Sequence, residues 1–216
     1  MVIVQVVVGP LETNCYLVRE EHHPAALLLD PGAEPEVILE AVSSHEAQVQ
    51  AIVLTHGHPD HAGALREVAR ATEAPVYLHA LEEPALRQAW PEFGLFQPAL
   101  SPGLDVRHCR EGDSIAFGAS RLRVLHTPGH SPGSVCLVDE ELAFTGDTLF
   151  AGSVGRTDLP GGDAAALNAS LARLLRELSS ITLLYPGHGL ASVMTQELAG
   201  NPWLVGLAAG RQLPTG

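Results

Sequence analysis

Short apolar runs and stretches of helical periodicity alternate along the chain. The apolar and alternating runs predict strands near residues 2–8, 15–18, 26–30, 49–54 and 76–79. Helical spacing between these strands predicts helices at about 35–44 and 62–71. A second series of strands is predicted near residues 104–108, 114–117, 121–125, 134–138 and 141–144, followed by a helix at about 163–178 and a last strand over 181–185. Two groups of strands, each with its own helices, favour two sheets packed face to face.

Composition limits the classes of function. The chain has 216 residues and a formal charge of −13, and all 12 of its basic side chains are arginines. An acidic chain without a basic stripe is a poor candidate for binding nucleic acid, because phosphate contacts need clustered basic side chains. No run approaches the roughly 20 apolar residues that span a bilayer, and residues 2–8 lack a basic leader. We therefore expect a cytoplasmic protein that binds neither nucleic acid nor membrane.

Residues 55–61 (THGHPDH) place three imidazoles and one carboxylate within a single turn between a predicted strand and a predicted helix. Neutral imidazole is the commonest ligand for zinc and iron, and a carboxylate adds a hard oxygen. The glycine and proline of this turn allow a tight backbone path. We expect His56 and His58 to converge on one ion, while Asp60 and His61 face a second. The alternative is a polar loop with solvated histidines, in which Asp60 caps the next helix.

Three later turns each present one more side chain that can bind a metal. Each turn follows a predicted strand and is rich in glycine or proline, and the side chains are His130, Asp147 and His188. Each signal is weak alone, since a histidine beside glycine in a turn is more often only exposed. Together with the first turn they supply five histidines and two aspartates. A dinuclear centre needs this inventory, because each ion takes about three protein ligands and a water.

These seven residues, in this order, resemble the H-x-H-x-D-H…H…D…H ligand set of the metallo-β-lactamase superfamily, in its glyoxalase II-like branch. Residues 13–18 (TNCYLV) and 29–32 (LDPG) extend the likeness towards the start of the chain. The resemblance implies an α/β fold, an αββα four-layer sandwich of two mixed β-sheets flanked by helices, with the metals at one edge. It assigns the ligands as His56, His58 and His130 on one ion, Asp60, His61 and His188 on the other, and Asp147 between the two. The residues alone leave the bridge undecided, although an anion between two cations relieves their repulsion.

The implied chemistry is hydrolysis by a hydroxide held between the ions, with Asp60 and Asp147 as the catalytic carboxylates. Metal binding lowers the pKa of water from about 15.7 to about 7. Residues 146–150 (GDTLF) and 155–160 (GRTDLP) are similar to the pattern of the glyoxalase II-like thioesterases and of the related persulfide dioxygenases, and the favoured substrate class is an acyl thioester such as S-D-lactoylglutathione. Two zinc ions are favoured as cofactors, and iron or manganese would accept the same ligands.

Two other functions stay open on the same residues. Persulfide dioxygenases also resemble this chain, and they use one iron held by two histidines and a carboxylate, which here would be His56, His130 and Asp147. The other alternative is a non-catalytic scaffold in which metal ions only staple the loops. Asymmetric ligand sets with room for water argue against that scaffold.

The chain departs from the classical glyoxalase II enzymes near its end. Those enzymes append a helical domain that grips glutathione, whereas only 216 − 188 = 28 residues follow His188 here. We expect one domain over 1–216 without a separate C-terminal glutathione-binding domain, acting as a monomer or homodimer on a small thioester. Arg156 is a candidate for binding a substrate carboxylate, with an ion pair to Asp158 as the alternative. Asp30 either orients a ligand histidine from outside the metal shell or ends its strand in an Asx turn.

The remaining histidines and cysteines are expected to be structural. His79, His108 and His126 fall at strand ends and are predicted to be surface residues rather than ligands. The cysteines are odd in number and widely separated, so no disulfide framework is predicted. Cys15 and Cys136 lie in apolar strand patterns and are expected to be buried small apolar side chains. Cys109 follows His108, and we expect it to be structural rather than a thiol ligand, because adjacent residues of a strand point to opposite faces.

Overall fold

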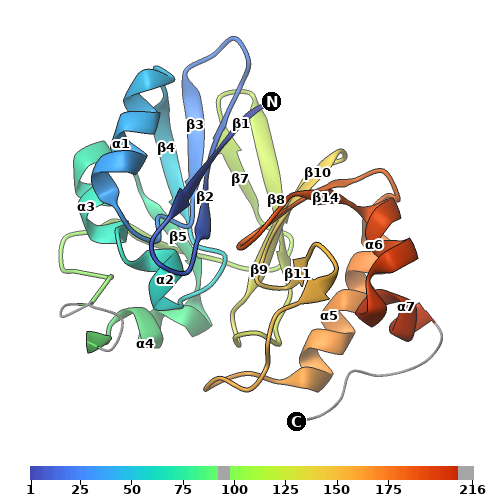
Figure 1. The fold of residues 1–216 in the computed structure, drawn as a ribbon. Helices are drawn as coiled ribbons and strands as arrows, with labels where there is room; N and C mark the ends of the chain where they lie inside the picture. The colour runs from blue at the N-terminus through green and yellow to red at the C-terminus, as the bar shows by residue number, and fades with distance from the viewer. Residues whose placement is uncertain (92–97, 209–216) are drawn as a thin grey trace.

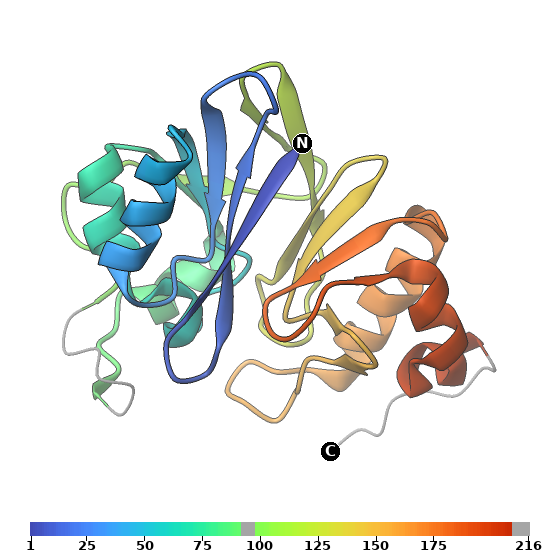
Figure 2. The same ribbon diagram turned by 45° about the horizontal axis from the view of Figure 1, so that its top comes forward.

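The structure is a computed structural model that describes residues 1–91 and 98–208. Most of its strands form two six-stranded sheets that face each other. Helices cover the outer side of each sheet, so the layers run helix, sheet, sheet, helix (Figures 1 and 2). The predicted αββα sandwich is therefore confirmed.

The first sheet has the order β1-β2-β3-β4-β5-β6 and is built from the N-terminal half of the chain. Its strands are β1 (Val2–Val8), β2 (Thr13–Arg19), β3 (Ala25–Leu29), β4 (Gln48–Val53), β5 (Val76–His79) and β6 (Val106–Cys109). The first three strands are antiparallel neighbours, and the pairs from β3 to β6 are parallel. The helical elements of this half are α1 (Pro35–Ser44), α2 (Pro59–Ala62), α3 (Leu65–Thr72), η1 (Ala80–Glu82) and α4 (Glu83–Leu86).

The second sheet has the order β14-β13-β10-β9-β8-β7. Its strands are β7 (Ser114–Phe117), β8 (Ser120–His126), β9 (Val135–Val138), β10 (Leu142–Gly146), β13 (Leu183–Pro186) and β14 (Ser192–Val193). The pair β10–β13 is parallel and the other pairs are antiparallel. A small hairpin of β11 (Leu149–Phe150) and β12 (Ser153–Val154) adjoins this sheet, and the helices of this half are α5 (Ala164–Glu177), α6 (Met194–Gly200) and α7 (Pro202–Ala208).

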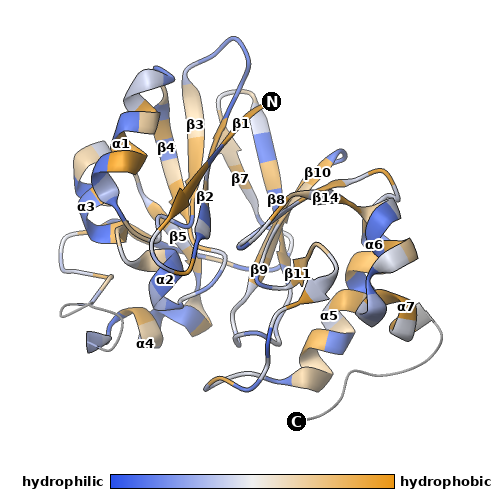
Figure 3. Cartoon of the chain, viewed as in Figure 1, coloured by the Kyte–Doolittle hydropathy of each residue, from blue (hydrophilic) through white to orange (hydrophobic). Residues whose placement is uncertain are grey.

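Both faces of the central strands are buried, which is why their sequences read as nearly continuous apolar runs (Figure 3). In β3, Leu27 and Leu29 belong to the core between the two sheets, whereas Ala26 and Leu28 pack with the residues of α1 and α3. The second sheet repeats the pattern, because Leu137 of β9 joins the central core and its neighbours pack with α5. Because successive side chains of a strand point to opposite faces of its sheet, the buried apolar residues form three cores, one between the sheets and one under the helices on each side.

The helix predicted at about residues 62–71 is found as α3, which begins three residues later, and a separate short helix, α2, precedes it. α2 begins with Pro59 at its first turn, where proline needs no amide partner. The chain then leaves the helical ladder, and the Ala64 N–H donates to the Pro31 carbonyl oxygen at 3.0 Å. Backbone of the loop after β3 also passes close to this turn, since a Cβ on Gly32 would lie 1.8 Å from the Asp60 carbonyl oxygen. This close approach anchors the turn that carries the predicted ligands.

Other differences from the predicted elements are small. Most predicted strands are found within two residues of their expected bounds, and helix α5 is confirmed. The sequence analysis missed the short elements β11, β12, β14, α6 and α7. The cysteines are buried and free, as predicted. Over residues 1–91 and 98–208, no helix has the length and apolar character needed to cross a membrane.

Candidate metal centre

Four loops bring the predicted ligands to one edge of the sandwich. In the second sheet β8 and β10 are each antiparallel to β9, and β13 is parallel to β10, so these three strands point the same way. Their carboxyl ends lie at one edge, and the turns beyond them carry His130, Asp147 and His188. The loop after β4 of the first sheet meets them there, and the Val135 N–H donates to the Thr55 carbonyl oxygen at 2.8 Å. Both sheets therefore contribute to one site.

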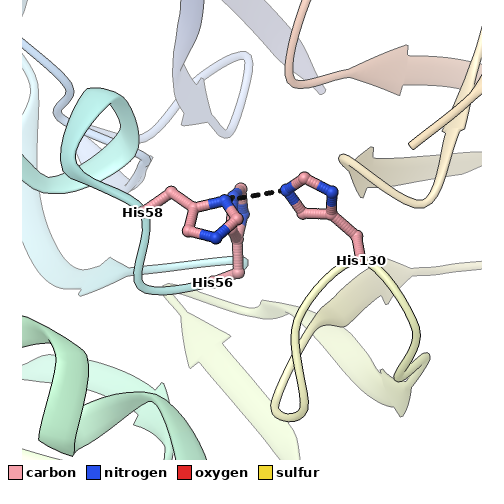
Figure 4. A group of neighbouring side chains, drawn as sticks. All are labelled: His56, His58 and His130. Atoms are coloured by element: carbon pink, nitrogen blue, oxygen red, sulfur yellow. Dashed lines mark hydrogen bonds between the residues drawn. The ribbon is translucent and has the colours of Figure 1, made fainter. Parts of the chain in front are cut away.

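The first ligand group consists of His56, His58 and His130, whose rings face one another across the two loops (Figure 4). His58 Nδ1 lies 3.0 Å from His56 Nε2 and 2.8 Å from His130 Nε2. His56 and His130 are 1% and 3% exposed, so the alternative of solvated histidines is wrong. Three ring nitrogens that point at one place suit a bound cation better than a chain of hydrogen bonds.

The second ligand group consists of Asp60, His61 and His188. Nε2 of His61 and Nε2 of His188 are 3.3 Å apart. Oδ2 of Asp60 lies 3.2 Å from the His188 nitrogen and 3.5 Å from the His61 nitrogen. The alternative in which Asp60 caps the next helix is wrong. The N-cap residue of α2 is His58, and no side chain makes a capping hydrogen bond there.

Asp147 lies between the two ligand groups. Its Oδ1 is 3.3 Å from His61 Nε2, and its Oδ2 is 3.5 Å from His130 Nε2 and 3.6 Å from His188 Nε2. Oδ1 is buried and, apart from this contact with His61, has no hydrogen-bond partner among the residues that the structure describes. A buried carboxylate oxygen without a hydrogen bond is costly in a protein interior. A cation at this point would satisfy it, so the side chains present fit a metal centre.

Hydrogen bonds behind the rings orient the ligand histidines. Nδ1 of His130 donates to the Arg156 carbonyl oxygen at 2.8 Å, and Nδ1 of His188 donates to the Leu11 carbonyl oxygen at 3.0 Å. Nδ1 of His61 lies 3.0 Å from Oδ2 of Asp30. Each contact places a ring proton on Nδ1 and turns the Nε2 nitrogen towards the centre.

Asp30 holds more than one part of the site. Its backbone has a φ of 49°, in the left-handed region. Its carboxylate accepts hydrogen bonds from the Thr55 N–H and the Thr55 hydroxyl, both at 2.7 Å, in addition to its contact with His61. Oγ1 of Thr55 in turn lies 3.1 Å from Nδ1 of His56. The structure thus links Asp30 to His61 directly and to His56 through one hydroxyl.

The two ligand groups differ in proton affinity. Burial and the neighbouring His61 hold the pKa of His56 well below its usual range, and burial with His130 lowers the pKa of His58 to about 4. Burial opposes protonation of His61 as well, but Asp147 and Asp30 outweigh it and raise the pKa of that ring. Asp60 and Asp147 likewise raise the pKa of His188 against the effect of its burial. His56 and His58 are therefore ready to bind a cation at neutral pH, whereas His61 and His188 would have to release protons first.

Arg156 does not point its guanidinium at the ligands. The side chain pairs with Asp158 at 2.6 Å, and both residues are largely exposed. This ion pair is the alternative that the sequence analysis named. The backbone carbonyl of Arg156 contributes to the site through its bond to His130, a role that no side-chain pattern reveals.

A pocket of about 420 Å³ adjoins the second ligand group. It lies between the turn after β1, the loop after β3 and helix α2, and Asp60 and Thr13 form part of its wall. The hydroxyl of Thr13 donates to Oδ2 of Asp60 at 3.1 Å. The rest of the lining is mostly proline, glycine and aliphatic side chains, and none of the lining residues is basic. An apolar group could therefore lie beside the ligands.

The histidines predicted to lie outside the site are indeed absent from its ligand groups. His79 and His126 stack on each other with ring centroids 4.2 Å apart, and His108 pairs with Glu83. Cys109 is buried with a pKa raised to about 12 by burial, which makes it an inert thiol. Glu82 was missed, although its buried carboxylate lies among the ligand loops.

The fold and these groups of side chains define a class, an αββα protein with a centre of histidines and aspartates at the edge of its sandwich. A family model described as the metallo-beta-lactamase superfamily matches residues 8–188. The match spans most of the chain, and the chain belongs to the metallo-β-lactamase superfamily.

Similar proteins place the chain near the glyoxalase II-like branch. The hydroxyacylglutathione hydrolase GloC of Haemophilus influenzae is 32% identical over 91% of this chain and 95% of its own length. The crystal structure of TTHA1623 in a di-iron-bound form is 43% identical, with a TM-score of 0.82 over 93% of this chain and all of that chain. The crystal structure of ETHE1 from Myxococcus xanthus is 29% identical, with a TM-score of 0.79 over 95% of this chain and 85% of that one.

Proposed function

We propose that this protein is a dinuclear metallo-hydrolase that cleaves acyl thioesters. The position of Asp147 carries the proposal, because its two carboxylate oxygens lie within 3.3–3.6 Å of ligand nitrogens from both groups. One carboxylate in contact with two separate ligand groups suits a bridge between two cations. The likeness to GloC and to a di-iron-bound structure supports the same assignment.

The ligands would be His56, His58 and His130 for one ion, and Asp60, His61 and His188 for the other, with Asp147 in contact with both. Divalent ions there would polarise the thioester carbonyl and lower the pKa of a water to near neutrality. Zinc suits this set of nitrogen and oxygen donors, and iron or manganese would accept it as well.

The protein's own part is to orient and admit the reactants. The side chains of His188 and Asp60 are 27% and 19% exposed, so substrate and water would approach from the second ligand group. Asp60, held by the Thr13 hydroxyl, would orient the attacking water, and Asp147 would keep the two ligand groups at a fixed separation. A thiolate is a good leaving group, so the reaction needs little help from a general acid.

The pocket beside Asp60 bears on the choice of thioester. Its lining carries proline and aliphatic groups and no basic side chain, so it offers room for an uncharged acyl or thiol portion. A peptide-like thiol such as glutathione would have to place its carboxylates elsewhere. S-D-lactoylglutathione remains the first substrate to test, and thioesters with apolar acyl chains are the second.

The test combines metal analysis with an activity panel. Protein loaded with zinc, iron or manganese would be assayed under nitrogen for release of thiol from S-D-lactoylglutathione and from apolar acyl thioesters. We expect metal-dependent hydrolysis of at least one of them at two ions per chain. Full activity with a single ion, or no thioester hydrolysis with any of these metals, would contradict the proposal.

A persulfide dioxygenase is the second candidate. The three side chains that one iron would need are adjacent, since the rings of His56 and His130 are 4.8 Å apart and His130 Nε2 is 3.5 Å from Asp147. Oxygen uptake by the iron-loaded protein with glutathione persulfide, together with no thioester hydrolysis, would favour this candidate over the first.

A further inference from the structure

Glu82 is a buried carboxylate between two of the loops that carry ligands. It lies in η1, directly after β5, and is 3% exposed. Its Oε2 accepts a hydrogen bond from the Gly57 N–H at 2.7 Å. Its Oε1 accepts bonds from the Ser131 hydroxyl at 2.8 Å and from the Gly133 N–H at 2.5 Å. One side chain therefore joins the loop after β4 to the loop after β8.

Each of the two loops has a glycine where the carboxylate of Glu82 approaches its backbone. A Cβ on Gly57 would lie 2.9 Å from Oε2 of Glu82, and a Cβ on Gly133 would lie 2.7 Å from Oε1. Neither glycine has a positive φ. Space for the carboxylate, rather than a left-handed backbone, therefore explains why these two positions are glycine.

The residues that Glu82 contacts adjoin ligands of the first group in the sequence. Gly57 stands between His56 and His58 in the chain, and Ser131 follows His130. The closest pair of ligand nitrogens in that group, 2.8 Å apart, joins His58 to His130 and thus spans the two loops. The separation of these nitrogens depends on how the loops are held together.

We propose that Glu82 is a positioning residue that presets the first ligand group for its metal ion. The carboxylate fixes the loop carrying His56 and His58 against the loop carrying His130, so the three nitrogens already converge before a metal binds. Outer hydrogen-bond partners of metal sites typically change metal affinity by about 10–100-fold when removed. The inference rests on the metal centre of the proposed function and is independent of the substrate.

The test uses Glu82→Gln, which keeps the size of the side chain but turns an NH₂ group towards at least one of the N–H or O–H donors. Glu197→Gln is the matched control. Glu197 is also buried, at 4% exposure, and accepts bonds from the Gly152 N–H at 2.8 Å and the Asn201 side-chain amide at 2.9 Å. Neither partner adjoins a proposed ligand in the sequence, so this variant reports the general cost of losing a buried carboxylate.

Zinc affinity of the metal-free protein would be measured by calorimetry for each ligand group separately. His188→Ala removes a ligand of the second group and leaves the first to be titrated, and His58→Ala does the reverse. We expect Glu82→Gln to weaken zinc binding by about 10–100-fold in the His188→Ala background and by less than about threefold in the His58→Ala background. Glu197→Gln should change neither affinity by more than about threefold.

Hydrogen exchange in the metal-free protein gives a readout without metal. Residues 55–61 and 127–134 should both exchange faster in Glu82→Gln and not in Glu197→Gln. If Glu82→Gln does not fold, Ser131→Ala can replace it, because it removes one of the three hydrogen bonds to Glu82. It should also weaken zinc binding to the first ligand group more than to the second, by a smaller factor than Glu82→Gln.

Equal weakening of both ligand groups, or a lower melting temperature with unchanged zinc affinity, would overturn the positioning role and leave Glu82 as a stabilising residue only. Wild-type protein that bound no zinc, iron or manganese would overturn the inference together with the proposed function. Selective weakening of the first group in a protein that hydrolyses no thioester would refute the proposed substrate class and support the role of Glu82.

Discussion

The two ligand groups lie side by side, yet the pKa values of their histidines are shifted in opposite directions. In the first group three rings come together in a buried place, where burial lowers the pKa of His56 and His58. In the second group carboxylates outweigh burial and raise the pKa of His61 and His188. The first ion would bind to the His56 and His58 rings without displacing a proton, whereas the second would have to displace protons from His61 and His188. The two ions are therefore not expected to be equivalent.

The largest effect is expected from Asp147→Ala, which removes the side chain that the two groups share. Both metal affinities should fall, and turnover should drop by more than the ~100-fold that follows the loss of an outer hydrogen-bond partner. Metal content by mass spectrometry and thiol release with a thioester check this. A variant that kept two ions and full turnover would end the bridging assignment.

A pair of smaller changes separates the two groups. Asp30→Asn alters the partner of His61 and should weaken the second ion by about 10–100-fold, whereas Thr55→Val removes the hydroxyl beside His56 and should mainly weaken the first. Calorimetric zinc titrations of both variants provide the comparison. Identical effects of the two substitutions would show that the groups respond as one unit.

Acidification should separate the two ions without any substitution. The raised pKa values of His61 and His188 mean that protons compete for the second group at higher pH than for the first, where His58 titrates at about 4. Affinity for the second ion should fall by about tenfold per pH unit for each proton displaced. Metal release followed between pH 7 and pH 4 should show two steps, with the second group emptied first. Release of both ions in one step would remove the distinction.

Stability of the metal-free protein depends on pH with opposite signs in the two groups. The raised pKa of His61 and His188 stabilises the fold below the ordinary value of 6.5, and this contribution is lost as pH rises through the raised pKa. The lowered pKa of His58 removes stability as pH falls from 6.5 towards about 4, because the unfolded chain then binds a proton that the fold excludes. Denaturant unfolding of His58→Ala from pH 6.5 down to about pH 4 measures the contribution of the first group. The same experiment with His188→Ala, carried from below pH 6.5 upwards, measures that of the second group.

The smallest effect is expected from Arg156→Ala. Its guanidinium is exposed and paired with Asp158, while His130 is held by the backbone carbonyl that the substitution leaves in place. Melting temperature and metal content should stay unchanged. A higher KM at constant kcat would assign the guanidinium to substrate binding, and a lost ion would show that the side chain supports the first group.

Some parts of the fold and of the candidate site could be predicted from the sequence, and others could not. The ligands of residues 55–61 form a dense motif, and two groups of strands with their own helices predicted two sheets packed face to face, whereas the αββα layers came from the family resemblance. The later turns were weak signals singly, and only the whole set pointed to a centre. Glu82 was not found because an acidic residue in a short helical segment usually faces solvent, and only the folded chain shows its three donors. The break between α2 and α3 was missed since it depends on Pro31, which is distant in sequence.

Assembly of the centre must follow the order in which the ribosome delivers the chain. His61 emerges 127 positions before His188, so the N-terminal ligands leave the exit tunnel well before their last partner is made. N-terminal regions generally fold first during synthesis. A nascent polypeptide would thus expose three imidazoles and a carboxylate with an incomplete shell, and capture of the two proposed ions would be a late step of maturation that waits for β13.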